Sequence, residues 1–320
     1  MNGAWIINAG VASTIAPDHA CAQIGTADLV WIHAQASVGA GPAAISGYAQ
    51  IPEYARVALL AQETRPRFDA INGGAIINLR GKGLRTDDQG DPLVSLRLWV
   101  ADGLVVSVAF HHLQGIEPVH ALVQSGHVHD PGDLVSALAD AITDTMDPEI
   151  AALGDELDRI EEGLDSATNP LRLRRRVAPV RSMAIQYRRF VVPQRIAIER
   201  MATAEFDWLD AADRLKLRTA ADRCARMGEE LESVRERAAI VHDELTDLRS
   251  ERLDSRGLQI SIIATIFLPL TFLTGLLGMN VQGIPFADHP HAFWGVSIFC
   301  LLVSIFTGAY FYWRHWPNRD

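Results

Sequence analysis

Hydrophobic positions are distributed very unevenly along the 320-residue chain. Two uncharged apolar runs, residues 258–277 and 292–313, lie close to the C-terminus. Each run is long enough, as a helix, to cross the hydrocarbon core of a bilayer, which requires about 20 residues. We therefore predict a two-helix transmembrane hairpin, with a connecting loop at residues 278–291 and a short cytoplasmic tail at residues 314–320.

The longest regular pattern directly precedes the first apolar run. Apolar residues recur every seven positions from Leu217 to Leu245, and a second series, three positions further on, runs from Ala220 to Leu248. A stripe of this kind over about five heptads is typical of a long helix that packs along one face, as in a coiled coil. We therefore predict a stalk helix over residues 207–257 that continues into the first membrane span.

Strand patterns are confined to the first part of the chain. Two hairpins are predicted, over residues 67–80 and 93–110, each around a glycine-containing turn. A short apolar run lies at residues 28–34, and residues 51–62 have the apolar spacing of a helix. Together these elements predict an α/β cytoplasmic domain, residues 1–130, around a mixed or largely antiparallel sheet.

The pattern becomes helical beyond residue 130. Residues 131–206 are predicted to form cytoplasmic helices that pack on the stalk, one over residues 133–163 and another over residues 171–204. Because proline removes a backbone donor and clashes with the preceding turn, Pro179 and Pro193 predict that the second of these helices is broken or offset.

The charge of the chain argues against a nucleic-acid partner. The net charge is −10, whereas binding to phosphate backbones requires a basic face. About a dozen Asp and Glu residues lie between residues 130 and 165, and a basic stretch that begins at Arg172 follows them. We interpret these stretches as solvated helix faces with ion pairs between neighbouring helices, and a cation-concentrating surface is the alternative.

Cysteine usage adds no metal site to this picture. The three cysteines are far apart and form no CxxC pair. They therefore indicate neither a disulfide framework nor a cysteine-based zinc site. The N-terminal residues have no signal-peptide pattern.

Basic residues predict the orientation of the hairpin. They flank both apolar runs, whereas residues 281–291 between the runs contain no Lys or Arg. By the positive-inside rule, both termini are cytoplasmic and the loop lies outside, as expected for a multi-pass protein of the cell inner membrane. The flanking residues are Arg249, Arg252 and Arg256 before the first run, and Arg314 and Arg319 after the second.

One face of the first apolar run carries mostly small or hydroxylated residues when the run is projected as a helix. This stripe is either a small-residue packing seam between helices or the wall of a pore. Both interpretations imply oligomerisation, because a single two-span chain cannot enclose a channel. The stripe consists of Asp254, Gly257, Ser261, Ala264, Leu268, Thr271 and Gly275.

The C-terminal part of the chain contains, in this order, a long stalk, an apolar run closed by Gly278-Met279-Asn280, a short loop and a last apolar run. This order resembles the CorA superfamily of magnesium and divalent-cation channels. Segments of the N-terminal domain and of the loop are similar to the ZntB zinc transporters. They are Glu63-Thr64-Arg65-Pro66-Arg67, Leu79-Arg80-Gly81, Val94-Ser95-Leu96-Arg97-Leu98-Trp99 and Val281-Gln282-Gly283-Ile284-Pro285.

The resemblance implies a funnel-shaped homopentamer in the lipid bilayer, with five first spans around the axis. Gly278, Met279 and Asn280 would form the selectivity mouth, where the Asn280 amide oxygens meet a hydrated ion. Gly278 would permit the turn, and Met279 would pack. The implied pore lining is part of the stripe described above: Thr271, Leu268, Ala264, Ser261 and Gly257, with Asp254 at the inner mouth.

Pore chemistry does not determine which divalent cation is transported. Zinc prefers Cys and His ligands, whereas the predicted pore offers amide, hydroxyl and apolar groups. Zinc, with no resident cofactor, is therefore implied by the resemblance alone, and magnesium, nickel or cobalt transport is the alternative. Neither span contains an acid or a base, so coupling to a proton gradient would use groups outside the spans.

Histidines outside the spans are further candidates for metal chemistry. Asp288, His289 and His291 in the outer loop are candidate metal ligands, and an ordinary polar loop is the alternative. In the N-terminal half, scattered histidines are interpreted as surface residues, with a regulatory metal site as the alternative. These are His111, His112, His120, His127 and His129.

Two other classes of protein are alternatives to a transporter. An enzyme is not predicted, because no phosphate loop or catalytic grouping stands out. A membrane-anchored coiled-coil sensor or scaffold, in which the hairpin serves only as an anchor, fits the heptads equally well. The uncharged small-residue stripe and the Gly-Met-Asn at its outer end favour the transporter.

Overall fold

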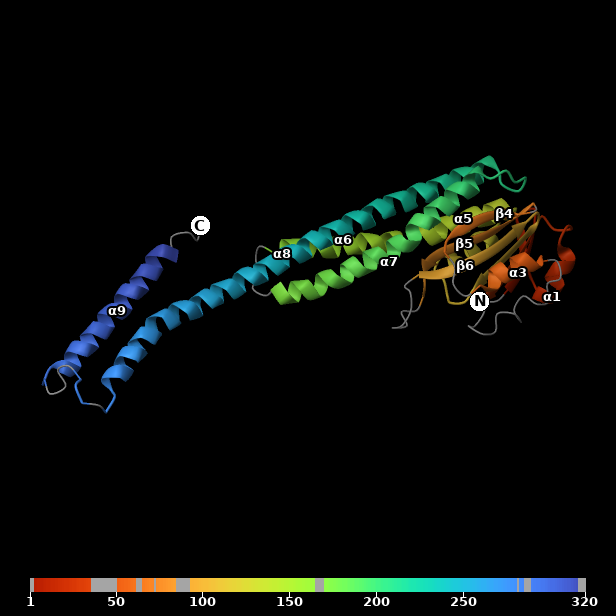
Figure 1. Ribbon diagram of the computed structural model, residues 1–320. Coiled ribbons are helices and arrows are strands. Elements are labelled where there is room, and N and C mark those ends of the chain that lie inside the picture. The colour runs from red at the N-terminus through yellow and green to blue at the C-terminus, as the bar shows by residue number, and fades with distance from the viewer. Residues whose placement is uncertain are drawn as a thin grey trace. The chain divides into compact units, whose positions relative to one another are not determined.

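The computed structural model describes residues 3–35, 51–61, 65–71, 73–84, 93–164, 170–280, 282–284 and 289–315. The chain divides into two compact units, Met1–His242 and Asp243–Asp320. The first unit contains a sheet and a set of helices, and the second contains two apolar helical segments (Figure 1). Helix α8, Ala211–Leu277, contributes to both units.

A seven-stranded mixed sheet forms the body of the first unit. Its strand order is β2-β1-β3-β7-β6-β5-β4. Strands β3 and β7 are parallel, and all other neighbours are antiparallel, which confirms the predicted mixed sheet. The strands are β1 Gly3–Asn8, β2 Val11–Ile15, β3 Leu29–Gln35, β4 Arg67–Ile71, β5 Gly74–Lys82, β6 Leu93–Ala101 and β7 Leu104–Ala109.

Both predicted hairpins are present. Ile71 pairs with Gly74 in β4–β5 and Ala101 pairs with Leu104 in β6–β7, so each turn has two residues between the paired positions. The second turn contains Gly103, whose φ of 64° suits a glycine because it has no Cβ. Asn72, which the sequence places in the first turn, lies outside the described residues.

The helices are short among the sheet strands and long after them. In the first unit they are α1 Pro17–Ala20, the 3-10 turn η1 Cys21–Gln23, α3 Glu53–Leu60, α4 Ile116–Gln124, α5 Pro131–Asp144, α6 Asp147–Glu162, α7 Pro170–Thr203 and most of the N-terminal half of α8. The second unit holds the rest of α8 and α9, Ala292–His315.

Strand β3 is buried along nearly its whole length. Val30 and Ile32 belong to a core cluster that includes Leu59 of α3. Trp31 and His33 are also buried and point to the opposite face, because side chains alternate along a strand. Burial on both faces explains the uninterrupted apolar run in this part of the sequence.

The segment predicted as one helix over residues 133–163 is two helices, α5 and α6. Helix α6 begins at Asp147 with a proline in its first turn, where the missing N–H costs nothing. Helix α7 runs through Pro179 and Pro193 without ending, so the predicted break is wrong. Its buried side chains extend on both sides of Pro179, and this packing holds the helix together where a backbone hydrogen bond is lost.

The heptad stripe of α8 is buried along the part that lies in the first unit, up to Val241. Leu217 and Leu231 are fully buried. Cys224 Sγ lies 3.8 Å from Thr143 Oγ1 of α5, so the stripe packs against helices of the same chain. Ion pairs reinforce this packing, as in Arg223 with Asp140 at 3.3 Å.

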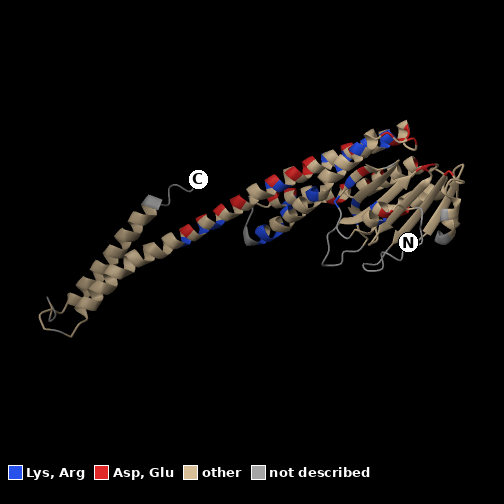
Figure 2. Cartoon of the chain, turned by 45° about the vertical axis from the view of Figure 1, so that its right-hand side comes forward, with Lys and Arg blue, Asp and Glu red and all other residues tan. Residues whose placement is uncertain are grey.

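Acidic and basic residues are interspersed along the long helices of the first unit (Figure 2). Arg176 lies 2.9 Å from Glu156, and Arg188 lies 2.7 Å from Glu232. Arg237 pairs with Glu161 and with Asp158, which raises the pKa of its guanidinium. These contacts support the interpretation of the acidic and basic stretches as ion pairs between neighbouring helices.

Candidate ion pathway

Two helices of the chain are long and apolar enough to cross a membrane. Their most apolar segments lie in α8 and α9 and have mean hydropathies of 2.2 and 2.0. No acidic or basic residue is coloured in Figure 2 along the C-terminal end of α8 or along the described part of α9 that precedes its last turn. These segments correspond to the two predicted membrane spans.

The first span has two different faces. One face is half-buried within the second unit, and the stripe predicted as a pore wall lies on the opposite side when about 100° is allowed per residue. The half-buried positions recur at helical spacing along the span. They are Ile262, Ile266, Leu270, Leu273 and Leu277.

The second span also has one half-buried face, and it is rich in small side chains. The remaining side chains of α9, including Phe299 and Phe306, are exposed. The half-buried face consists of Ala292, Val296, Ser297, Cys300, Val303, Ser304, Thr307, Gly308 and Phe311. Each span therefore turns a single face inward in the hairpin.

The predicted stripe on α8 is left open by the chain itself. Asp254, Gly257, Ser261, Leu268, Thr271 and Gly275 are exposed, and Ala264 is half-buried. The Thr271 hydroxyl donates to the Phe267 carbonyl at 2.7 Å, so its proton is used by the helix backbone. The oxygen lone pairs of Thr271 therefore remain available as acceptors for a cation or its water shell.

Phe272 lies on the side of the stripe, although its side chain is neither small nor hydroxylated. Its ring is 72% exposed and projects to the same side as Ser261 and Leu268. Leu268 is 68% exposed and lies one turn before Phe272. A search for small and hydroxylated residues does not find Phe272, whereas the angle of its helical projection identifies it.

Helix α8 ends at the Gly-Met-Asn segment. The Gly278 N–H donates to the Thr274 carbonyl at 2.9 Å, and a Cβ on Gly278 would lie 3.0 Å from that same oxygen. A side chain at this position would therefore require the helix end to shift by a few tenths of an ångström. The positive φ in this region belongs to Gly283, at 96°.

Met279 and Asn280 follow the helix end and are both exposed in the chain. Met279 is 47% exposed, so the packing implied for it is incomplete within one chain. The amide of Asn280 offers one acceptor oxygen and two donor hydrogens, which suits contact with the water shell of an ion.

The outer loop brings two histidines together. The rings of His289 and His291 lie 5.9 Å apart, and the His291 backbone N–H donates to His289 Nδ1 at 3.3 Å. Asp288, the third candidate ligand, lies outside the described residues. Among the described residues, no three His, Cys, Asp or Glu side chains are placed to hold a metal ion.

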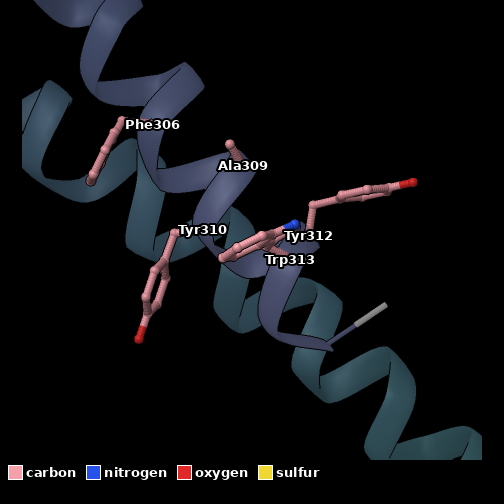
Figure 3. A pocket seen from close by; sticks show the side chains of 6 residues that line it. Phe306, Ala309, Tyr310, Tyr312 and Trp313 are labelled. Atoms are coloured by element: carbon pink, nitrogen blue, oxygen red, sulfur yellow. The ribbon is translucent and has the colours of Figure 1, made fainter. Parts of the chain in front are cut away.

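An open apolar notch of about 480 Å³ lies at the C-terminal end of α9. Phe306, Ala309, Tyr310, Tyr312 and Trp313 line it, and Figure 3 shows the rings of Tyr310 and Tyr312 pointing away from each other. Aromatic residues with polar tips are typical of the interface between bilayer and water. The lining residues of this notch include no carboxylate or imidazole, the groups that bind divalent metal ions in most protein sites.

The chain is similar to known proteins over most of its length. The family described as CorA-like Mg2+ transporter protein matches residues 26–314. The zinc transport protein ZntB of Pectobacterium atrosepticum is 31% identical over 297 residues, which cover 91% of this chain and 89% of that protein.

Solved structures with the same fold cover nearly the whole chain. The full-length CmaX protein has a TM-score of 0.79 at 27% identity and covers 97% of this chain and 96% of its own. The CorA magnesium transporter of Methanocaldococcus jannaschii has a TM-score of 0.80 at 16% identity, with 97% of each chain covered. The sheet, the long helix and the two apolar helices are thus a shared fold.

Proposed function

The chain belongs to the CorA-like Mg2+ transporter family, and from that premise we propose that it transports zinc through the central pore of a homopentamer. The observation that carries the proposal is the open stripe of α8, which lies opposite the half-buried face of that helix; the exposed Asn280 follows shortly after the helix ends. A face that one chain leaves open at membrane depth can be covered by copies of itself, and five copies enclose a path for ions.

The Gly-Met-Asn segment and the stripe residues have different proposed roles in this pore. Gly278, Met279 and Asn280 form the outer mouth, where the Asn280 amides contact the hydrated ion. Thr271 offers lone pairs to the water shell below the mouth. Leu268, Ala264, Ser261 and Gly257 line the path inward, and Asp254 attracts cations at the inner mouth.

The proposed organisation follows from the charge flanking the spans. Residues 1–257 and 314–320 are cytoplasmic, residues 258–277 and 292–313 cross the inner membrane, and residues 278–291 lie outside. In this arrangement the outer loop holds His289 and His291 near the entrance, where their imidazoles can capture zinc together with Asp288.

Zinc is proposed as the ion because of the ZntB relative, whose name assigns zinc transport to that protein. The family description names magnesium, and the oxygen donors of the stripe suit hard cations as well. Transport of magnesium, nickel or cobalt is therefore the second candidate. Proton coupling, if the transporter uses it, depends on groups outside the spans, because these contain no acid or base.

Flux into liposomes tests the proposal. The purified chain is reconstituted with a zinc-sensitive dye inside, and zinc, magnesium, nickel and cobalt are compared with and without a pH gradient. We expect zinc-dependent flux above that of empty vesicles. A folded oligomer that gives no metal-dependent flux would contradict the transporter proposal and favour a membrane-anchored sensor or scaffold.

Two variants test the proposed mouth. Asn280→Ala is expected to abolish flux while the oligomer stays intact, because the variant removes the amide that meets the ion. Gln282→Ala is the matched control, since Gln282 is an exposed amide in the same loop and is expected to leave flux unchanged. Equal flux in both variants would remove Asn280 from the proposed role.

A further inference from the structure

His33 is a buried imidazole that the proposed ion pathway does not use. It lies on β3 with 3% of its surface exposed, opposite Ser107 of the parallel strand β7. Its Nδ1 is 2.8 Å from Ser107 Oγ. The same hydroxyl accepts the Trp31 Nε1–H at 2.9 Å and lies 3.3 Å from the Ile32 carbonyl.

These contacts favour one tautomer of His33. A hydroxyl has one proton and two lone pairs. All three contacts are hydrogen bonds when His33 Nδ1–H and Trp31 donate to Ser107 and Ser107 donates to Ile32. In this arrangement the proton is on Nδ1, and Nε2 of His33 carries a lone pair.

The ring of His33 is neutral at cytoplasmic pH. Burial, together with positive charge nearby that includes His112 and His120, lowers its pKa to about 4. A neutral imidazole whose Nδ1–H is held by a second group has the electronic state and the fixed orientation of a metal-binding histidine.

A small pocket of about 20 Å³ adjoins His33, and its lining combines polar side chains with the apolar Leu113 and Ile116. Its lining includes Gln35 at the end of β3, His111 and His112 after β7, and Glu117 in the first turn of α4. The space is enough for about one water or one small ion. It lies at the carboxyl ends of the parallel pair β3 and β7, the edge where open α/β sheets bind ligands.

We propose that this pocket binds one divalent transition-metal ion, with His33 Nε2 as the fixed ligand. His111, His112 and Glu117 are exposed, so their side chains are free to rotate toward the ion and complete its coordination. This rotation is necessary, because no three His, Cys, Asp or Glu side chains among the described residues are already placed to hold a metal.

Ligand chemistry determines the class of ion. Imidazole suits zinc, nickel and cobalt, whereas magnesium and calcium prefer oxygen ligands. A bound ion would link the ends of β3 and β7 to the first turn of α4. The site lies in the first unit and is separate from the stripe of α8, so it goes beyond the proposed transport.

Cobalt binding to the full-length protein in detergent tests this site. The background carries His289→Ala and His291→Ala, which removes the loop imidazoles as competitors. We expect one saturable cobalt ion per chain, with the visible absorbance of nitrogen-bound cobalt, that zinc displaces and magnesium does not. His111→Ala with His112→Ala should weaken cobalt binding by at least about tenfold.

Matched variants make the test decisive. His127→Ala with His129→Ala removes two exposed histidines elsewhere in the same unit and should leave cobalt affinity unchanged. His33→Gln should abolish the absorbance, with thermal unfolding measured to verify the fold. The absence of saturable cobalt binding, or equal affinity with and without His111 and His112, would overturn the proposal. Because no flux is measured, failure here is distinct from failure of the transport proposal.

Discussion

Gly278 occupies a position where the backbone leaves no room for a side chain. The Cβ of an alanine would lie 3.0 Å from the Thr274 carbonyl oxygen, which is closer than ordinary van der Waals contact. Overpacking of this kind costs about 1–3 kcal/mol, and each 1.4 kcal/mol changes a population about tenfold. We therefore predict that Gly278→Ala shifts the end of α8 and lowers ion flux in liposomes about tenfold.

A second glycine provides the control for this prediction. Gly295 lies near the start of α9, and no atom lies within 4 Å of the position its Cβ would take. Gly295→Ala is expected to leave flux unchanged. Flux of Gly278→Ala equal to that of wild type would show that the helix end adapts without cost and that glycine is not required there.

Cys224 lies in the heptad stripe of α8 and is predicted to be chemically inert. Burial raises the pKa of its thiol to about 11, so only about one thiol in a thousand is ionised at pH 8. We expect no labelling of Cys224 by a maleimide in the folded protein, and full labelling in denaturant, as read by peptide mass spectrometry. Rapid labelling of Cys224 in the native protein would mean that α8 separates from α5.

The β1–β2 hairpin shows why some turns escape sequence analysis. Its turn is Ala9-Gly10, and Ala9 has a φ of 51°, which residues with a Cβ seldom adopt. Asp28 stabilises this conformation by accepting the Ala9 N–H at 2.7 Å. The stabilising group is 19 residues away, so a local reading centred on Asn-Gly or Asp-Gly turns does not predict it.

At the scale of elements, the N-termini of α5 and α8 share a cluster of carboxylates. Asp213 is 1% exposed, and its carboxylate accepts Ser136 Oγ–H at 3.0 Å. Lys216 Nζ lies 3.0 Å from Asp133 and 3.4 Å from Asp213. Burial raises the pKa of Asp213. At Asp133 burial is outweighed by side-chain hydrogen bonds from Lys216 and His129, which lower the pKa of that carboxyl.

We predict that Lys216→Gln destabilises the first unit by about 1–2 kcal/mol at neutral pH, because it removes the cation shared by Asp133 and Asp213. The loss should shrink as the pH falls through the folded-state pKa values of these groups. Once Asp213 is protonated it carries no negative charge, so removal of the Lys216 cation no longer affects it. Because the pKa of Asp213 is raised in the folded state, its protonation at acidic pH favours the folded state.

Melting temperatures of wild type and Lys216→Gln, measured from pH 7 down to pH 4, check this prediction. Arg218→Gln is a control for loss of a basic residue, since no ion pair of Arg218 is found among the described side chains. A difference between wild type and Lys216→Gln that stays constant with pH would exclude loss of the Asp213 charge as its cause, because Asp133, whose pKa is lowered, stays ionised over most of this range.

Helix α8 also shows what periodicity does and does not predict. The heptads from Leu217 to Leu245 predicted a long helix, and α8 extends from Ala211 to Leu277. Periodicity does not name the partner of a stripe, which here includes α5 and its Thr143. Likewise, proline rules predicted a break in α7, whereas the tertiary packing that carries the helix through Pro179 depends on residues distant in sequence.

Across the whole molecule, the sequence predicted structure best where the surrounding lipid or water determines which positions are hydrophobic. Uncharged length predicted both spans, and the projection of the first span separated the stripe from the face that is half-buried. The sequence named His111 and His112 only as members of an alternative metal site, and their meeting with His33 and Glu117 was not predicted, because β3, the residues after β7 and α4 meet only through the fold. Sites built from distant segments have no local signature in one sequence.

The open stripe leads to a prediction about assembly. In a pore, stripe residues of neighbouring subunits face one another, whereas the half-buried face meets the α9 side of the hairpin. We predict that Leu268→Cys, in a background with Cys21→Ala and Cys300→Ala, is cross-linked between subunits in membranes by a short bismaleimide. Cys224 can remain, because its buried thiol is inert.

Ile266→Cys is the matched control, since this residue lies two positions away on the opposite, half-buried side of the same helix. Only Leu268→Cys should give a cross-linked dimer on denaturing gels, because one reactive thiol per subunit can join two chains and no more; this dimer would support contact between copies through the stripe. If both variants cross-link equally, the two faces do not differ in their access to neighbouring copies. A cross-linked dimer from Ile266→Cys alone would place the pore on the other side of α8 and remove Leu268 and Thr271 from its lining.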